Sequence, residues 1–129
     1  MIFVDTSVWV KALRSSSNRE ASHLEDLLDR DEVALPVVVR LEILTGASRR
    51  DRARLRRSLS ALPVFLPQTE TWDRIEGWIE VASAEGDRFG IADLLVAALA
   101  AEQDAWLWSL DRDFQRMSRL GFVALHEPA

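Results

Sequence analysis

The sequence predicts an α/β fold, in which helices pack around a parallel sheet, and three observations support this prediction. Short apolar runs of strand character alternate along the chain with longer segments of helical periodicity. The 129 residues are 48% hydrophobic, which is enough for one closed core and too short for two full domains, so we expect a single domain over residues 1–129. The low content of Gly (5) and Pro (4) argues against a disordered chain.

In the first half of the chain, the elements follow from apolar spacing and helix-end signals. Residues 1–4 are an apolar run followed at once by Asp5, Thr6 and Ser7, a cluster typical of a helix start. Pro36 stops a short strand and suits the first position of the next helix. The expected elements are a strand at 1–4 and a helix after it, a helix at 18–30, a strand at 33–35, and helices at 37–44 and 49–62.

The second half continues the alternation of strands and helices. Thr69 or Thr71 is expected to cap its first helix, and residues 91–101 are apolar enough to form a helix buried on most sides. The expected elements are an apolar stretch at 64–66, a helix at 69–84, a loop at 86–90, a helix at 91–101, a strand at 105–108, a helix at 111–117 and a strand at 121–125. In a parallel sheet of this kind, functional residues gather at the carboxyl ends of the strands.

Composition excludes several classes of protein and of site. No apolar run reaches the roughly 20 residues that a membrane span needs, so no membrane association is expected. The first residues lack the features of a signal peptide, and there is no cysteine, which removes disulfides, thiol nucleophiles and cysteine-based zinc sites. We therefore expect a cytoplasmic protein.

The charge of the chain is distributed unevenly. The net charge is −5, yet residues 49–57 hold six arginines and one aspartate, which leaves −10 on the other 120 residues. This arginine block is either a solvated amphipathic helix face or a contact surface for an anionic partner, either RNA phosphate or an acidic protein segment. The block consists of Arg49, Arg50, Arg52, Arg54, Arg56 and Arg57.

Several carboxylates follow strands or begin helices, and each has a purely structural explanation. Asp5 could cap the first helix, and Asp93 could be stabilised by the dipole of the helix over 91–101. Asp111, together with Asp113, could cap the helix that follows the strand over 105–108.

Glu42 is harder to explain in this way. It lies inside an apolar helix, where it cannot cap, and Arg40 does not share its helix face. We expect a half-buried carboxylate that needs compensation, the alternative being a Glu at the helix margin that reaches solvent. Four carboxylates gathered in one pocket would repel one another, and a cation resolves this conflict. Oxygen ligands without His or Cys suit Mg²⁺ or Mn²⁺ and argue against zinc.

Four short motifs, in this order and in a chain of this length, resemble the PIN domain and in particular the VapC-type toxin ribonucleases of type II toxin–antitoxin pairs. The motifs are Val4-Asp5-Thr6-Ser7-Val8-Trp9, Glu42 with Leu44-Thr45-Gly46, Ile91-Ala92-Asp93, and Ser109-Leu110-Asp111-Arg112-Asp113-Phe114. The resemblance spans essentially the whole chain. It implies a three-layer α/β/α sandwich with a short, mainly parallel sheet and helices on both faces.

The resemblance also assigns roles to the residues of these motifs. It implies that Asp5, Glu42, Asp93 and Asp111 are catalytic and bind the metal, Mg²⁺ with Mn²⁺ possible. Thr6 or Ser7 would position a metal or the phosphate, and Ser109 stands where the family more often has Thr. Asp111 or Asp113 could be the fourth ligand, and Asp111 is preferred.

The activity implied by the resemblance is endonucleolytic hydrolysis of RNA. Water activated by the metal would be the nucleophile, and the products would carry a 5′-phosphate and a 3′-OH. The implied partners are an RNA substrate, a VapB-like antitoxin protein and a second copy of the chain in a homodimer. The two histidines, His23 and His126, adjoin no candidate motif and are expected to have surface or core roles.

Other functions are weighed against the ribonuclease. The main alternative is a catalytically silent RNA-binding or protein-interaction module with the same fold. A Mg²⁺-dependent phosphohydrolase also begins with a strand and an Asp, but the haloacid-dehalogenase type needs a second Asp at position 7, which is Ser. A receiver domain needs a Lys late in the chain, and Lys11 is the only lysine. No Gly-x-Ser-x-Gly motif supports a serine hydrolase.

Overall fold

Five short parallel strands form one sheet at the centre of the fold. The computed structural model describes residues 1–128. The strands are β1 (Ile2–Val4), β2 (Val33–Pro36), β3 (Val64–Phe65), β4 (Trp106–Trp108) and β5 (Ala124–Leu125). Their spatial order is β3-β2-β1-β4-β5, and every neighbouring pair is parallel. The predicted parallel sheet is therefore confirmed.

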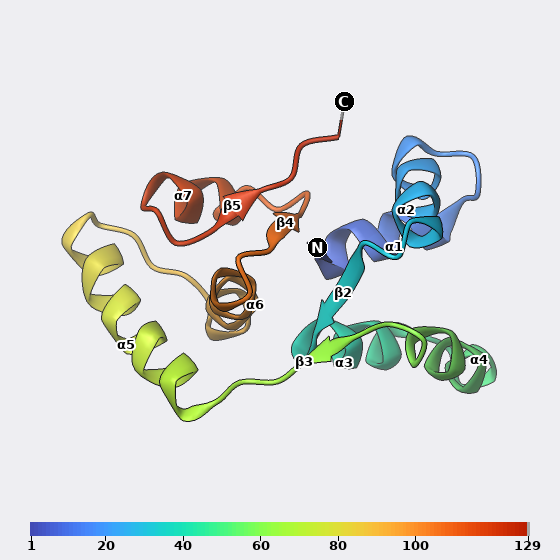
Figure 1. Ribbon diagram of the computed structural model, residues 1–129, viewed down its shortest axis with the longest axis horizontal. Coiled ribbons are helices and arrows are strands. Elements are labelled where there is room, and N and C mark those ends of the chain that lie inside the picture. The colour runs from blue at the N-terminus through green and yellow to red at the C-terminus, as the bar shows by residue number, and fades with distance from the viewer. Residues whose placement is uncertain (129) are drawn as a thin grey trace.

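Helices cover both sides of this sheet. Figure 1 shows α1 and α2 on one side of the strands and α5, α6 and α7 on the other. This arrangement confirms the three-layer α/β/α sandwich. The helices are α1 (Thr6–Arg14), α2 (Arg19–Asp29), α3 (Val37–Gly46), α4 (Arg49–Leu59), α5 (Thr69–Ala84), α6 (Ile91–Glu102) and α7 (Asp113–Arg119).

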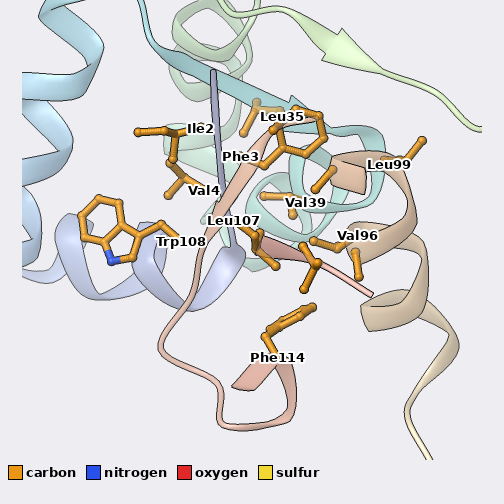
Figure 2. Close-up of a cluster of buried hydrophobic side chains, with 14 of the residues drawn as sticks. Ile2, Phe3, Val4, Leu35, Val39, Val96, Leu99, Leu107, Trp108 and Phe114 are labelled. Carbon is orange, nitrogen blue, oxygen red and sulfur yellow. The ribbon is translucent and has the colours of Figure 1, made fainter. Parts of the chain in front are cut away.

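The core lies where β1 is paired on both edges and covered on both faces. Phe3 and Val4 have no exposed surface, because a strand in this position contacts neighbours on every side. Figure 2 shows side chains from β1, β2, β4, α3 and α6 meeting in this cluster, with Phe114 of α7 closing it. Among the helices that the structure describes, none is long and apolar enough to cross a membrane.

The structure shortens two of the predicted helices at one end. The helix expected over 49–62 ends at Leu59, because Pro63 disfavours helical geometry at Leu62. The helix expected over 111–117 begins at Asp113, because Asp111 forms the turn that precedes it and accepts a 2.9 Å hydrogen bond from the Asp113 N–H. Gly121, at a φ of 83°, allows the chain to turn after this helix.

Other boundaries move by one to three residues. Pro36 is the last residue of β2 and the N-cap of α3, not its first helical residue. Gln68 is the N-cap of α5, and Thr71 supports it by accepting a 3.0 Å hydrogen bond from the Gln68 N–H. The last strand is limited to Ala124–Leu125, since only these residues pair with β4.

The strand order brings β1 and β4 together at the point where the chain changes direction across the sheet. From β1 the chain moves outward through β2 to β3, then returns to β4 on the other edge of β1 and continues to β5. Crevices of α/β sheets form at the carboxyl ends of the two strands at such a switch point. Asp5 follows β1 and Ser109 follows β4, so both predicted site residues lie at this position.

Candidate metal centre at the ends of β1 and β4

Asp5 is a buried carboxylate, with 6% of its surface exposed, and serine hydroxyls hold it. Ser7 and Ser109 each donate a 2.8 Å hydrogen bond to its Oδ2 atom. The carboxylate accepts no hydrogen bond from a backbone N–H at the start of α1, although Asp5 occupies the N-cap position. Capping therefore does not explain this side chain, whose orientation is set by residues from two strand ends.

Glu42 is joined to the same region by Thr6, whose hydroxyl donates a 2.8 Å hydrogen bond to its Oε1 atom. Glu42 is exposed, so the expectation of a half-buried side chain is wrong. The alternative of a Glu at the helix margin is the correct description of its burial. Solvent and Thr6 compensate its charge, and α3 still directs it towards the beginning of α1.

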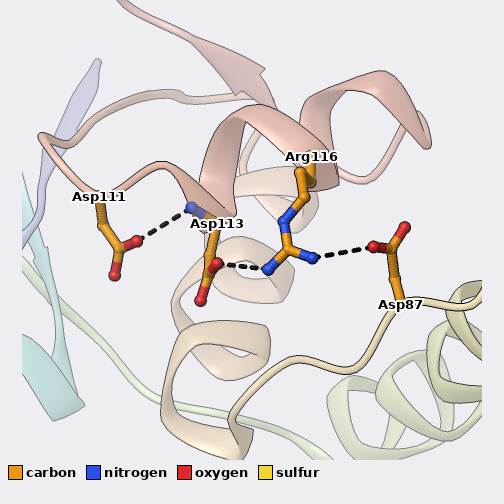
Figure 3. Close-up of polar contacts among 4 residues, drawn as sticks. All are labelled: Asp87, Asp111, Asp113 and Arg116. Carbon is orange, nitrogen blue, oxygen red and sulfur yellow. Dashed lines mark hydrogen bonds and ion pairs between the residues drawn. The ribbon is translucent and has the colours of Figure 1, made fainter.

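The C-terminal carboxylates Asp111 and Asp113 differ in their neighbours. Figure 3 shows Arg116 between Asp113 and Asp87, donating to both carboxylates, with a distance of 2.9 Å to Asp87. The guanidinium of Arg116 also lies 5.0 Å from the centre of the Phe89 ring. Asp111 has no ion-pair partner within residues 1–128, and one of its oxygens accepts the Asp113 N–H. Asp111 thus keeps an uncompensated charge, whereas Asp113 is neutralised by Arg116.

Asp93 completes the cluster from the first turn of α6. Its carboxylate, with those of Asp111 and Asp113, offers oxygens that all lie within 4.8 Å of one another. Burial, and then the charges of the other carboxylates, raise the pKa of Asp93 to about 6. A helix dipole alone would lower the pKa of a carboxylate in this position, so burial and the neighbouring charges dominate at Asp93. The carboxylates acting on Asp93 are Asp111, Asp5, Asp113 and Glu42, in decreasing order.

The structure therefore places the predicted acids and the alternative fourth ligand Asp113 near enough for the charges of the other four to act on Asp93. Within residues 1–128, Asp113 alone among these five carboxylates forms an ion pair. Neighbouring negative charges that lack basic partners either take up protons or bind a cation. Oxygen donors alone match the preference of Mg²⁺ and Mn²⁺, so the residues present fit such an ion.

The arginine block forms α4, which follows the helix that carries Glu42. All six arginines are exposed, and Leu59 provides the buried side of the helix. Arg52 donates to the carbonyl oxygens of Leu44 and Ala47, at 3.1 and 3.3 Å, and so fastens α4 to the end of α3. Arg54 pairs with Asp51 at 3.3 Å. Within residues 1–128, no polar contact holds the side chains of Arg49, Arg50, Arg56 and Arg57.

Sequence reasoning missed the position of the two histidines. His23 and His126 contact each other, with 2.8 Å between their Nε2 atoms, and they line a pocket together with Ser109 and Asp111. No local pattern of the sequence shows this contact, because it follows from the strand order: His126 directly follows β5, which pairs with β4. The histidines therefore do adjoin a candidate motif in space, although neither does so in sequence.

Comparison with known proteins identifies relatives that match 93% of the chain. Ribonuclease VapC11 of Mycobacterium tuberculosis is 29% identical over 125 residues, and the match covers 93% of each chain. A protein of Mycobacterium bovis, VapC ribonuclease Mb1587, matches with the same identity and coverage. These similarities extend well beyond the candidate metal centre.

Solved structures confirm the fold independently of close sequence identity. VapBC2 of Rickettsia felis, bound to a DNA fragment from its promoter, superposes with a TM-score of 0.80 at 20% identity and covers 100% of both chains. FitAcB of Neisseria gonorrhoeae superposes with a TM-score of 0.81 at 22% identity, covering 99% of this chain and 98% of that chain. The model of the PIN domain family matches residues 2–120. The chain belongs to the PIN domain family.

Proposed function

We propose that this protein is the toxin of a toxin–antitoxin pair and acts as a metal-dependent endoribonuclease. The observation that carries the proposal is the group formed by Asp93, Asp111 and Asp113, whose carboxylates each offer an oxygen within 4.8 Å of the others. Asp5 and Glu42 lie outside this group but are near enough for their charges to help raise the pKa of Asp93 to about 6. The similarity to VapC ribonucleases over 93% of the chain supports RNA as the substrate. Products with a 5′-phosphate and a 3′-OH are part of the proposal.

In this proposal, Asp5, Glu42, Asp93 and Asp111 hold Mg²⁺ or Mn²⁺. Bound there, the ion would supply an activated water and stabilise charge on the phosphate. Asp111 is preferred to Asp113 as the fourth ligand, because Arg116 already neutralises Asp113.

The hydroxyl groups around the carboxylates act as positioning groups. The hydroxyls of Ser7 and Ser109 each donate a hydrogen bond to Asp5 Oδ2, and these two bonds fix the direction of the other Asp5 oxygen. The N–H of Leu110 donates to Ser7 Oγ at 3.0 Å, so the loop after β4 is tied to the start of α1. Pre-oriented oxygens of this kind lower the reorganisation that ligand binding requires.

The proposed partners are RNA, an antitoxin protein and a second copy of the chain. RNA would meet the free arginines of α4, whose phosphate contacts would be sensitive to salt. The VapBC family is a family of toxin–antitoxin systems, and this supports a VapB-like antitoxin that covers the acidic cluster. A homodimer and cytoplasmic residence belong to the same proposal.

One experiment tests the activity directly. The purified protein, free of any partner, is incubated with single-stranded RNA in Mg²⁺, in Mn²⁺ and in EDTA, beside Asp5→Asn and Glu42→Gln. We expect cleavage with either ion, none in EDTA, and a loss of at least about 100-fold in both variants. Asp29→Asn and Glu25→Gln are matched controls at exposed positions of α2 and should cleave as the parent does.

The outcomes also separate the alternative functions. RNA binding without cleavage under every condition would favour a silent binding module. Hydrolysis of small phosphate esters would favour a phosphohydrolase. Cleavage that survives EDTA would contradict the proposed use of the carboxylates.

A further inference from the structure

A pocket of about 290 Å³ lies directly beside the carboxylates, on the side of β4 away from Glu42 and α4. Ser109 and Asp111 form its border with the acidic cluster. Its size is at the lower end of ligand pockets, roughly 300 Å³, which suits one small ring system and excludes a folded segment. A group bound there would sit next to any phosphate held by the carboxylates.

The floor of this pocket is made of flat rings. The imidazole planes of His23 and His126 are tilted by only 7°, and their centres are 5.1 Å apart. The distance of 2.8 Å between their Nε2 atoms is shorter than the roughly 3.5 Å contact of stacked ring faces, so the rings meet edge to edge. Together they form one nearly flat plate.

Trp108 supports this plate from the core. Its ring is almost perpendicular to both imidazoles, at centre distances of 4.8 Å to His23 and 6.0 Å to His126. Trp108 is only 3% exposed, so the plate cannot move far without disturbing the core. Burial, and then the charge of His23, lower the pKa of His126, so an uncharged ring is available for stacking at neutral pH.

The rim of the pocket carries hydrogen-bonding groups. Gln115 of α7 is exposed and offers both donors and an acceptor, while Arg19 at the start of α2 adds a planar cation. An aromatic floor with an amide and a guanidinium at the rim is the combination with which proteins hold an unstacked base of single-stranded RNA.

From this geometry we infer that the pocket binds one nucleobase of the RNA strand, next to the bond that is cut. The inference rests on RNA being the substrate, and it assigns nucleotide preference to His23, His126, Gln115 and Arg19. The plate would stack the base, and Gln115 and Arg19 would read its edge. The enzyme is then expected to prefer one base at a single nucleotide position beside the cleaved bond and to show no such preference at the other positions.

The first test uses free nucleosides, which carry no phosphate and need no metal. Adenosine, guanosine, cytidine and uridine are titrated into the wild-type protein in EDTA, and NMR follows the ring signals of His23, His126 and Trp108. We expect saturable shifts of these signals with at least one nucleoside, weakened about 10-fold in Gln115→Ala and in Arg19→Ala. Four titrations without such shifts would overturn the inference, even for a protein that cleaves RNA.

The second test measures cleavage of RNA randomised around the cut. We expect the wild type to prefer one base at one adjacent position, and Gln115→Ala or Arg19→Ala to reduce that preference about 10-fold. Gln103→Ala and Arg119→Ala replace exposed residues of the same types outside the pocket and should keep it. Unchanged preference in the pocket variants, with weakened binding of the antitoxin, would overturn the inference in favour of a protein occupant.

These readouts distinguish the inference from the proposed function. Nucleoside binding at the plate without RNA cleavage would support the base-binding pocket and contradict the ribonuclease function. Cleavage with equal preference for all bases at every position would support the ribonuclease function and contradict the base-binding pocket. Gln115 and Arg19 are exposed, so their variants should fold normally.

Discussion

Thr6 Oγ1 donates a 2.8 Å hydrogen bond to Glu42 Oε1 and so links the start of α1 to the middle of α3 across 36 positions of sequence. The contact is exposed, and an exposed hydrogen bond adds only about 1 kcal/mol or less to stability. Its greater effect is to hold a flexible carboxylate in one direction. Thr6 is thus a positioning residue for the acidic cluster.

Replacing Thr6 by Val removes this hydrogen bond while keeping the shape of the side chain. We expect kcat to fall about 10-fold with little change in KM, because Glu42 would be positioned in only part of the molecules. Thr6→Ser keeps the hydroxyl and should restore most of the rate. Thr69→Val is a control at an exposed position of α5. Equal rates for Thr6→Val and the parent would show that Glu42 needs no positioning.

The sequence predicted the sheet and the place of Asp5 at a strand end well, because both depend on local pattern. Val4 is followed directly by Asp5, and an apolar run that ends in an acid places that acid at a strand end whatever the rest of the fold does. The burial of Glu42 was predicted wrongly, because it depends on how α3 is inclined against α1. Helix spacing alone contains no information about that angle.

Long-range contacts also explain what the sequence left undecided about the site. The choice between Asp111 and Asp113 depends on Arg116, and Arg116 is held by Asp87 from the loop before α6. The contact of His23 with His126 joins residues 103 positions apart. Such pairs follow from strand order, and strand order is fixed by packing of the whole core.

Asp93→Asn should stabilise the metal-free protein at pH 7. Burial and the surrounding carboxylates raise the pKa of Asp93 to about 6, so the folded state binds protons more strongly here than the unfolded chain does. Its charge therefore costs stability as pH rises from about 4 through 6, and the cost persists above that. After discounting for partial exposure, we expect a gain of about 1–2 kcal/mol in the free energy of unfolding.

The measurement is denaturant unfolding in EDTA at pH 5 and pH 7. The difference between Asp93→Asn and wild type should be largest at pH 7 and fall to about half of that at pH 5, because the cost accrues between about pH 4 and pH 6. This comparison cancels the opposite effect of His126. With Mg²⁺ added, the wild type should gain stability and the variant should gain less. A variant that is less stable than the wild type at pH 7 in EDTA would contradict the raised pKa.

Removing the guanidinium of Arg116 should increase the negative charge of the cluster. In Arg116→Gln, Asp113 loses its ion pair, so carboxylate repulsion rises in the metal-free protein. We expect a lower Tm in EDTA and a larger rise of Tm on adding Mn²⁺ than in the wild type. Arg119→Gln, at the end of the same helix, is the matched control. Identical Mn²⁺-dependent shifts in both variants would show that Arg116 does not tune the site.

Asp111→Asn and Asp113→Asn separate the two candidates for the fourth ligand. Asp111 has no basic partner within residues 1–128, so its loss should weaken the Mn²⁺-induced rise of Tm and reduce cleavage at least about 100-fold. Asp113 is neutralised by Arg116, so its loss should act mainly on stability and reduce cleavage less. The reverse ranking of the two variants in cleavage would make Asp113 the ligand.

The arginines of α4 should act on RNA affinity and not on the chemical step. Arg49, Arg56 and Arg57 have free side chains within residues 1–128, and each contact with a phosphate of single-stranded RNA contributes about 0.7 to the slope of log affinity against log salt. Replacing all three by Gln should therefore reduce that slope by up to about 2. Binding to a non-cleaved RNA in EDTA, measured over a salt series, gives the slope.

A control with the same change in charge is needed, because any loss of three positive charges makes the protein more repulsive to RNA. Replacing Arg30, Arg88 and Arg119 by Gln provides it, since these exposed residues lie outside α4. A purely global effect would change the slope equally in both triple variants. Only direct phosphate contacts along α4 predict a larger decrease of the slope for the α4 triple variant than for the control. If the two slopes agree, while the α4 variant alone binds the antitoxin less tightly, the block serves the protein partner and not RNA.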